Sequence, residues 1–277
     1  DEASALDAFA WMQDIAEADN KRLVINNSWG LPQWGTPDGT SLSNQFIDAM
    51  SDEGVVIVTS NGNNGDSDFH FDHTFTAPGD TVRSLVTFYP LSSNPNAWGQ
   101  SLHLWGEPGR TIEASLGFAD GAFNASGNTP WILTEGGPGM WEDEIVVNGD
   151  DTVFYDVVVG QRHPANGRPF LQIRVHKGQS NVNVILQVTS PLGEVHAWNH
   201  TYLTNDVGNW GYDFSSAGQP GWTAGDPFYG VQHPASSQNV IAVGAHSADF
   251  VNSGGNEIGG QLAYFSSFGP TLDLSLI

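Results

Sequence analysis

The middle of the chain constrains the fold most, because between about Phe71 and Ser216 no segment shows the period of a helix. Short segments that alternate in polarity or are rich in β-branched residues follow one another, and turns such as Gly106-Glu-Pro-Gly109 separate them. Many short strands with regular turns predict an antiparallel β-sandwich or jelly roll. The expected strands are 81–89, 101–105, 111–117, 144–147, 152–159, 170–175, 183–188 and 194–199.

Two helices are expected before this stretch. Apolar residues recur at three- and four-residue steps over residues 3–19, which predicts an amphipathic helix. A second helix is expected over 42–53, where Leu42, Phe46, Ala49 and Met50 would share one face and Gly54 follows the end.

Short apolar runs at 23–25 and 55–58 alternate with these helices and predict buried parallel strands. A strand, a helix and a strand in this order predict a right-handed parallel crossover. We therefore predict an α/β fold whose partial parallel-sheet core is interrupted by the antiparallel sandwich. The expected boundaries are residues 1–65 for the first part of the core, 66–229 for the insertion and 230–277 for the second part of the core.

The second strand runs into a turn of Asn and Gly at residues 61–65. Ligands of parallel sheets bind beyond the carboxyl ends of the strands. An Asn at such an end can direct its amide group into a cleft, and Gly62 would let a backbone approach closely. An ordinary Asn-Gly turn is the alternative.

Several segments together resemble the subtilisin-like serine proteases (subtilases, peptidase S8 family). Asn26-Asn-Ser-Trp-Gly30 resembles the segment that pairs with the substrate backbone, and Gly54–Gly65 resembles the segment that carries the oxyanion-hole asparagine. Pro234-Ala followed by Asn239-Val-Ile-Ala-Val-Gly-Ala245 resembles a further parallel strand, and Phe265-Ser-Ser-Phe-Gly-Pro270 resembles the segment before the nucleophile. A sandwich inserted after the oxyanion segment resembles clostridial Csp-type and related bacterial subtilases.

The resemblance implies a subtilisin-like core and assigns residues to a site. Asn63 matches the oxyanion-hole asparagine, with Gly62 beside it, and Ser28, Trp29 and Gly30 match positions that contact substrate. Simple packing is the alternative reading of Trp29.

The catalytic triad of this family has no matching residues here. The motifs Asp-Ser/Thr-Gly and His-Gly-Thr are absent, and Gly39-Thr-Ser41 precedes the oxyanion Asn instead of following it, so Thr40 and Ser41 are expected to cap a helix. We expect a fragment of a serine endopeptidase that is inactive alone and whose parent acts on a polypeptide substrate. The alternative is a non-catalytic protein- or glycan-binding sandwich on a degenerate protease scaffold.

The amino-acid composition limits which classes of partner the protein can bind and bears on the compartment in which it works. The chain has 31 Asp and Glu residues but only 8 Lys and Arg residues. The resulting net charge of −23 argues against nucleic acid or an anionic membrane as a partner. Either adaptation to salt or a secreted protein with carboxylates on Ca²⁺ would explain this charge. Without cysteine there is no disulfide, and no apolar run is long enough for a membrane span. The resemblance implies a secreted or extracytoplasmic protein.

Two further features concern ligands. Asp66–His73 is rich in oxygen ligands that suit Ca²⁺, and His70 with His73 could bind a transition metal. Because the spacing fits no specific site, we expect a solvated hinge there, assign no metal ligand, require no cofactor and keep Ca²⁺ as an optional ion. Exposed aromatic residues of the insertion could contact a partner or glycan, with packing as the alternative: Trp105, Trp131, Trp141, Trp198, Trp210 and Trp222.

Overall fold

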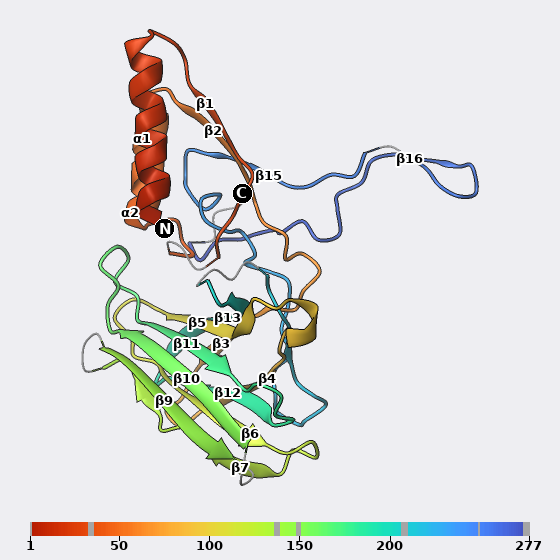
Figure 1. Ribbon diagram of the computed structural model, residues 1–277. Coiled ribbons are helices and arrows are strands. Elements are labelled where there is room, and N and C mark those ends of the chain that lie inside the picture. Colours follow the sequence, from red (N-terminus) through yellow and green to blue (C-terminus); the bar gives the residue numbers. More distant parts are fainter. Residues whose placement is uncertain are drawn as a thin grey trace. The chain divides into compact units, whose positions relative to one another are not determined.

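The computed structural model describes residues 2–32, 36–135, 139–147, 151–205, 210–248 and 250–273. The chain divides into two compact units (Figure 1). One unit combines Asp1–Asp66 with Pro227–Ile277, and the other is Ser67–Asp226. We call the first the split unit and the second the sandwich unit.

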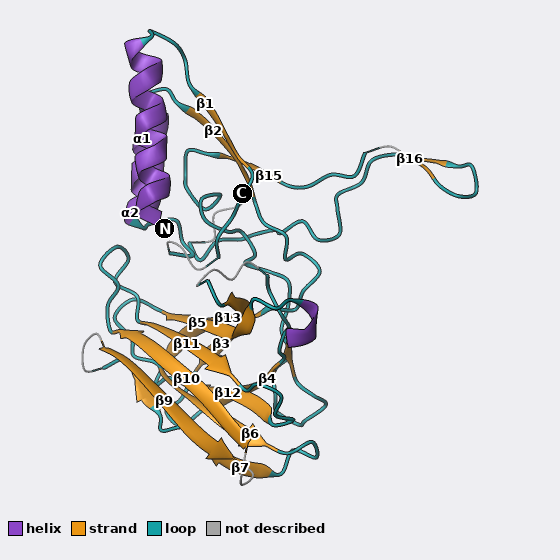
Figure 2. Ribbon diagram, viewed as in Figure 1, coloured by secondary structure: helices purple, strands orange, loops and turns teal. Residues whose placement is uncertain are grey.

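The sandwich unit consists of two antiparallel sheets (Figure 2). The first sheet has the order β3(His70–Phe75), β13(Gly193–Leu203), β5(Ala97–Gly106), β11(Phe170–His176), β10(Asp151–Gly160), β9(Gly139–Val147). The second has the order β14(Phe214–Ser215), β4(Thr81–Val86), β12(Asn183–Thr189), β6(Glu113–Ala119), β7(Ala125–Asn128), and β8(Ile132–Leu133) also pairs with β6. A short 3₁₀ helix, Leu91–Ser93, precedes β5.

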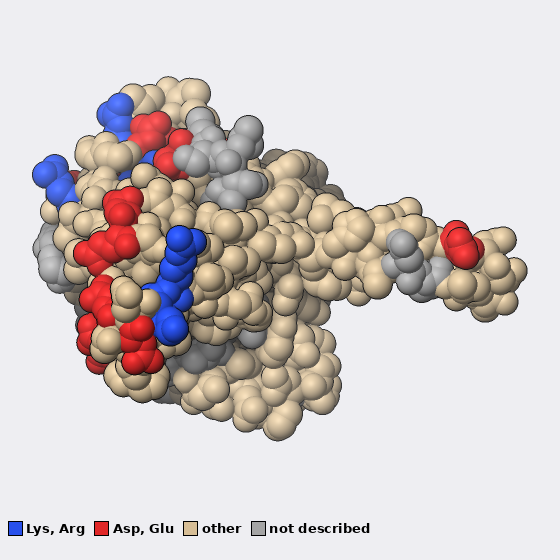
Figure 3. Space-filling view, turned by 90° about the horizontal axis from the view of Figure 1, so that it is seen from above, with Lys and Arg blue, Asp and Glu red and all other residues tan. Residues whose placement is uncertain are grey.

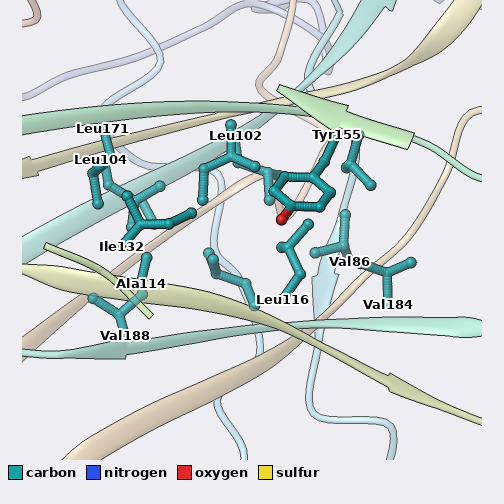
Figure 4. Packing of buried hydrophobic residues seen from close by; sticks show 14 of the residues in the cluster. Val86, Leu102, Leu104, Ala114, Leu116, Ile132, Tyr155, Leu171, Val184 and Val188 are labelled. Atoms are coloured by element: carbon teal, nitrogen blue, oxygen red, sulfur yellow. The ribbon is translucent and has the colours of Figure 1, made fainter. Parts of the chain in front are cut away.

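Alternate residues of these strands point between the two sheets and form one apolar core (Figure 4). In β11 the residues Leu171, Ile173 and Val175 are buried while their neighbours are less so, and Leu116 of β6 is fully buried in the same cluster. Such a period of two is what a sheet with one face on a core requires. The predicted strands therefore form in the segments whose apolar and polar residues alternate.

The split unit contains α1(Glu2–Ala18), α2(Leu42–Asp52) and a parallel sheet in the order β1(Val24–Asn27), β2(Val56–Ser60), β15(Ile241–Val243). β16(Phe250–Val251) and β17(Glu257–Ile258) form a small hairpin. The core of this unit is small and consists of Phe9, Ile25, Ile47, Met50, Val55 and Ile57.

The predicted α/β fold class is wrong, because the chain as a whole is mostly β. Its strands lie chiefly in the two antiparallel sheets, whereas the parallel part amounts to three short strands and two helices. There is thus no subtilisin-like α/β core among the described residues. Polar and glycine-rich sequence after β15 explains part of the difference, since it forms loops and one small hairpin instead of further helices.

Two local predictions are also corrected. The expected hinge is partly a strand, β3, because alternate residues Phe71 and Phe75 enter the sandwich core. In α2 the buried face holds Ser43, Asn44, Ile47 and Met50, whereas Leu42 is 80% exposed. Ser41, one of the two expected caps, begins α2 and accepts a hydrogen bond from the amide nitrogen of Asn44 at 3.2 Å.

Charged side chains cover only part of the surface seen in Figure 3, where acidic groups lie beside a few basic ones. Along α1 the carboxylates of Asp7, Asp14 and Glu17 are exposed, which fits solvated acidic residues. Neither helix of the described residues is both long and apolar enough to cross a membrane.

Candidate functional site

The carboxyl ends of β1 and β2 lie side by side in the split unit. The two strands are parallel, with Asn26 opposite Val58 and Asn27 opposite Thr59. The buried amide Nδ2 of Asn27 donates to the hydroxyl of Thr59 at 3.2 Å and to the carbonyl of Trp29 at 3.1 Å. These bonds hold residues 28–30 beside the turn that follows β2, as ligand sites of parallel sheets require.

The turn after β2 is fixed by Ser267, more than two hundred residues later in the chain. The amide nitrogen of Ser267 donates to the carbonyl of Gly62 at 3.0 Å, and its hydroxyl accepts from the amide nitrogen of Asn64 at 2.9 Å. The side chain of Asn61 donates to the carbonyl of Ser267. Gly65 donates to the carbonyl of Phe265 at 2.9 Å. The turn is therefore clamped on both sides of Asn63 by backbone and hydroxyl contacts.

Gly62 is required by this geometry. Its φ is +114°, a value that side-chain-bearing residues rarely adopt. A Cβ atom here would also lie 2.8 Å from the hydroxyl oxygen of Ser267 and 3.0 Å from Gln232. The neighbours that leave no room for a Cβ at Gly62 are the side chains of Ser267 and Gln232, and an approach of substrate to this backbone stays a prediction.

Asn63 is the exposed residue of the turn, between the buried residues Gly62 and Asn64. Within the described part of the chain, its side chain forms no hydrogen bond. The amide Nδ2 of Asn63 is accordingly a donor held on a rigid turn and directed to solvent. Preorganised donors of this kind stabilise negative charge that develops on a substrate oxygen.

Ser28, Trp29 and Gly30 form the neighbouring segment. Ser28 is exposed, and its hydroxyl accepts from the side chain of Asn26 at 3.3 Å. Trp29 stacks on Phe9 with a ring separation of 6.5 Å and an interplanar angle of 13°, yet it remains 37% exposed. The ring is thus partly packed and partly exposed, and substrate contact by Trp29 stays a prediction.

Gln232 joins the two segments and was missed by sequence reasoning. Its backbone nitrogen donates to the carbonyl of Asn61 at 3.2 Å, and its side-chain Oε1 would lie 2.7 Å from a Cβ on Gly30. The side chain is buried, and its Nε2 has no hydrogen-bond partner among the described residues. The available signal was its position two residues before the Pro234-Ala pair.

The next residue, His233, is also buried, and burial lowers its pKa to about 4. Its carbonyl accepts from the backbone nitrogen of Leu31 at 3.0 Å, which ties this segment to the residues after Gly30. A neutral imidazole at ordinary pH follows from this burial.

The described residues provide some of the groups that a substrate site at a strand end needs. They offer an amide donor at Asn63 and a segment, 28–30, beside it. No hydrogen bond between a serine and a histidine is found among the described residues of the split unit. Ser41 is occupied as the cap of α2, so Gly39-Thr-Ser41 has a structural role here.

In the sandwich unit, His70, Asp72 and Asp226 could hold a metal ion, since one ligand atom from each lies within 4.8 Å of the others. His73, expected beside His70, belongs to the other set of alternate residues on β3, and its Nε2 lies 3.1 Å from a carboxylate oxygen of Asp80.

The tryptophans of the insertion do not behave as one group. Trp105 and Trp198 are buried, and Trp222 is half-buried, whereas Trp131 and Trp210 are exposed. The side chain of Trp141 lies outside the described residues.

One solved structure with a similar fold is that of the Clostridium perfringens CspB protease. The TM-score is 0.65 at 16% sequence identity, and the match covers 100% of this chain and 52% of that chain. The chain thus spans about half the length of the structure it matches. No family model matches the sequence, and no curated protein does. Because the identity is low, the likeness is one of fold alone.

Proposed function

We propose that this chain is part of a subtilisin-like serine endopeptidase in which Asn63 donates to the oxyanion of the tetrahedral intermediate. The observation that carries the proposal is the turn itself. Asn63 is exposed, it lies at the carboxyl end of a parallel strand, and Gly62 and Ser267 fix the backbone on either side.

In the proposed reaction, a serine of the parent protein attacks the peptide carbonyl and a histidine carries the proton. Neither residue belongs to the site described above. The contribution of this chain is to stabilise the negative oxygen through Asn63 and to align the substrate backbone along Ser28, Trp29 and Gly30. Polypeptide is accordingly the substrate class, and a secreted or extracytoplasmic location goes with it. Ca²⁺ stays an optional ligand of the parent.

The small parallel sheet supports a role within a longer protein. Ile25 and Ile57 point into the core with the helices, but Val24, Val56 and Ile241 on the other face are between 43% and 64% exposed. Parallel sheets are normally covered on both faces. In this proposal the remainder of the parent protein covers the exposed face.

The test is Asn63→Ala in the complete parent protein, with hydrolysis of a chromogenic peptide as the readout. Loss of one oxyanion donor in subtilisin lowers kcat by about 10²–10³. We expect a decrease of that order in kcat with little change in KM, because the donor acts in the transition state.

Asn256→Ala is the matched control, since Asn256 is an exposed asparagine of the same unit, at the turn between β16 and β17. It should leave both constants unchanged. Equal changes in kcat and KM for Asn63→Ala would contradict the assignment.

A non-catalytic binding protein is the second candidate. Trp210 is 38% exposed and stacks on Tyr89 with a ring separation of 5.9 Å, a surface that suits a glycan or a protein partner. A serine-directed covalent probe distinguishes the two functions. Labelling of the parent protein favours the endopeptidase, and no labelling favours the binding protein.

A further inference from the structure

A cluster of histidines and carboxylates lies on one face of the first sheet of the sandwich unit. His70 and Asp72 are alternate residues of β3, and Glu194, His196 and Trp198 are alternate residues of β13. In the ladder, Asp72 is opposite His196 and His70 is opposite Trp198. Because alternate residues share a face, all five side chains lie on the side opposite to Phe71, Val195 and Ala197 of the apolar core.

A further carboxylate reaches the cluster from the end of the unit. The backbone nitrogen of His70 donates to the carbonyl of Asp226 at 3.1 Å, and the backbone nitrogen of Asp226 donates to the carbonyl of His70 at 2.6 Å. Gly225 permits this approach, since a Cβ at Gly225 would lie only 1.9 Å from the carbonyl oxygen of Asp68. The two main chains thus fix the carboxylate of Asp226 beside the imidazole of His70.

The side chains form a row of four groups. Asp226 Oδ1 lies 3.0 Å from His70 Nδ1, and His70 Nε2 lies 3.0 Å from His196 Nδ1. His196 Nε2 lies 3.5 Å from Glu194 Oε2. The ring of Trp198 packs 5.0 Å from that of His70, which is fully buried.

Two hydrogen bonds join Asp226, His70 and His196, and two neutral imidazoles supply one N–H for each of them. Asp72 and Asp226 bring two carboxylates to the imidazole of His70, with one ligand atom of each residue within 4.8 Å of the others. A bound cation would offset these two negative charges.

We propose that His70, Asp72 and Asp226 bind a divalent transition-metal ion of the Zn²⁺ class, with Nδ1 of His70 as the nitrogen ligand. His70 Nε2–H then donates to His196 Nδ1, and His196 Nε2–H points to Glu194. This arrangement is the usual one for a metal-binding histidine, whose second nitrogen donates to an outer partner that fixes the tautomer.

The donor set favours such an ion over Ca²⁺. One imidazole with two carboxylates suits a borderline ion, whereas Ca²⁺ takes six to eight oxygen ligands. Three protein ligands leave a position for water. Asp72 is exposed and the side chain of Asp226 is 31% exposed, so an ion can reach the buried ring of His70 from solvent.

The proposal is independent of the peptidase function, because every ligand belongs to the sandwich unit. The test is titration of the purified 277-residue chain with Co²⁺, followed by visible absorption, and competition of bound Co²⁺ by Zn²⁺. We expect a d–d band that saturates at one equivalent and disappears when Zn²⁺ is added.

Asp72→Asn and Asp226→Asn change partly exposed residues and should fold. Each should weaken Co²⁺ binding at least about tenfold, because even outer-shell changes commonly cost that much. His73→Gln is the matched control, as it removes a histidine of the same strand that pairs with Asp80 instead. It should bind Co²⁺ as the unaltered chain does.

A chain that gives no Co²⁺ band would overturn the proposal. Full binding by both aspartate variants would also overturn it, as would an equal loss in the His73→Gln control. None of these outcomes would alter the expectation for Asn63.

Discussion

The two units of this protein are held together in different ways. The sandwich unit has a continuous apolar core between two sheets, to which nearly every strand contributes alternate residues. The split unit has a small apolar cluster around Ile47 and Ile57 and relies on buried polar residues, among them Asn27, Asn64 and Ser267. Apolar burial mainly supplies stability, whereas buried hydrogen bonds fix the geometry of loops. We therefore expect the precisely positioned functional turn in the split unit.

Substitutions should destabilise the two units for different reasons. In the sandwich unit we expect unfolding free energy to be lost when a substitution leaves a cavity or when acid protonates a buried imidazole. In the split unit the expected losses come from the clamped turn around Gly62 and from His233.

The largest effect is expected from removing apolar volume in the sandwich core. Leu116→Ala at a fully buried position should lower the free energy of unfolding by about 2–5 kcal/mol, because a cavity remains. Leu133→Ala in β8 is the control, as Leu133 is 37% exposed and should lose much less. Urea unfolding followed by fluorescence measures both, and equal losses would contradict the proposed core.

Acid should weaken both units through histidines whose pKa is lowered by burial. Burial lowers the pKa of His103 in the sandwich unit and of His233 in the split unit to about 4, below the ordinary 6.5. Between these values the unfolded chain binds protons that the folded chain does not, so stability falls as pH decreases from 6.5 to 4.

The expected loss for His233 is about 3 kcal/mol at pH 4, from a shift of this size. Unfolding curves at pH 7 and pH 4 measure it. His233→Asn should reduce the pH dependence, whereas His246→Gln, at an exposed position, should not. A pH dependence unchanged by His233→Asn would show that this histidine is not buried as described.

The turn of the split unit should be sensitive at Gly62. Gly62→Ala should cost about 1–3 kcal/mol, because φ is +114° and the new Cβ would meet Ser267 and Gln232. Gly54→Ala is the control that separates backbone strain from steric contact. Gly54 also has a positive φ, +96°, but no atom lies within 4 Å of a Cβ added there. Thermal unfolding should show the greater loss for Gly62→Ala, and a greater loss for Gly54→Ala would contradict the clamp.

The smallest effect is expected at Ser267. Ser267→Ala removes the hydroxyl that accepts from the buried amide nitrogen of Asn64 and should cost about 1–2 kcal/mol. Ser28→Ala, at an exposed hydroxyl, should cost almost nothing. If both serine variants unfold alike in urea, the hydroxyl of Ser267 does not hold the turn.

Much of the sandwich could be predicted from sequence, because alternation along one strand reports which face is buried. The strand containing Leu171, Ile173 and Val175 is an example. β3 was missed because His70, Asp72 and His73 hid the alternate apolar residues Phe71 and Phe75. The segment is a strand because Phe71 and Phe75 enter the sandwich core and its backbone pairs with β13.

The candidate site was predictable only in part. The strand followed by an Asn-Gly turn pointed to residues 61–65, including Gly62, and the resemblance to subtilases singled out Asn63; both signals are local. The roles of Gln232 and Ser267 depend on pairings between residues far apart in the chain, and no local pattern reports such contacts. The error in fold class has a similar origin, since the resemblance rested on short segments while most residues belong to the sandwich.

The central claim is that Asn63 binds the oxyanion beside the segment formed by Ser28, Trp29 and Gly30. The most direct measurement is a crystal structure of the complete parent protein with a peptide aldehyde bound covalently to its nucleophile. We expect the inhibitor oxygen within about 3 Å of Asn63 Nδ2 and an inhibitor backbone that pairs with residues 28–30. An inhibitor oxygen bound by other donors, with Asn63 directed to solvent, would show that Asn63 is not the oxyanion donor.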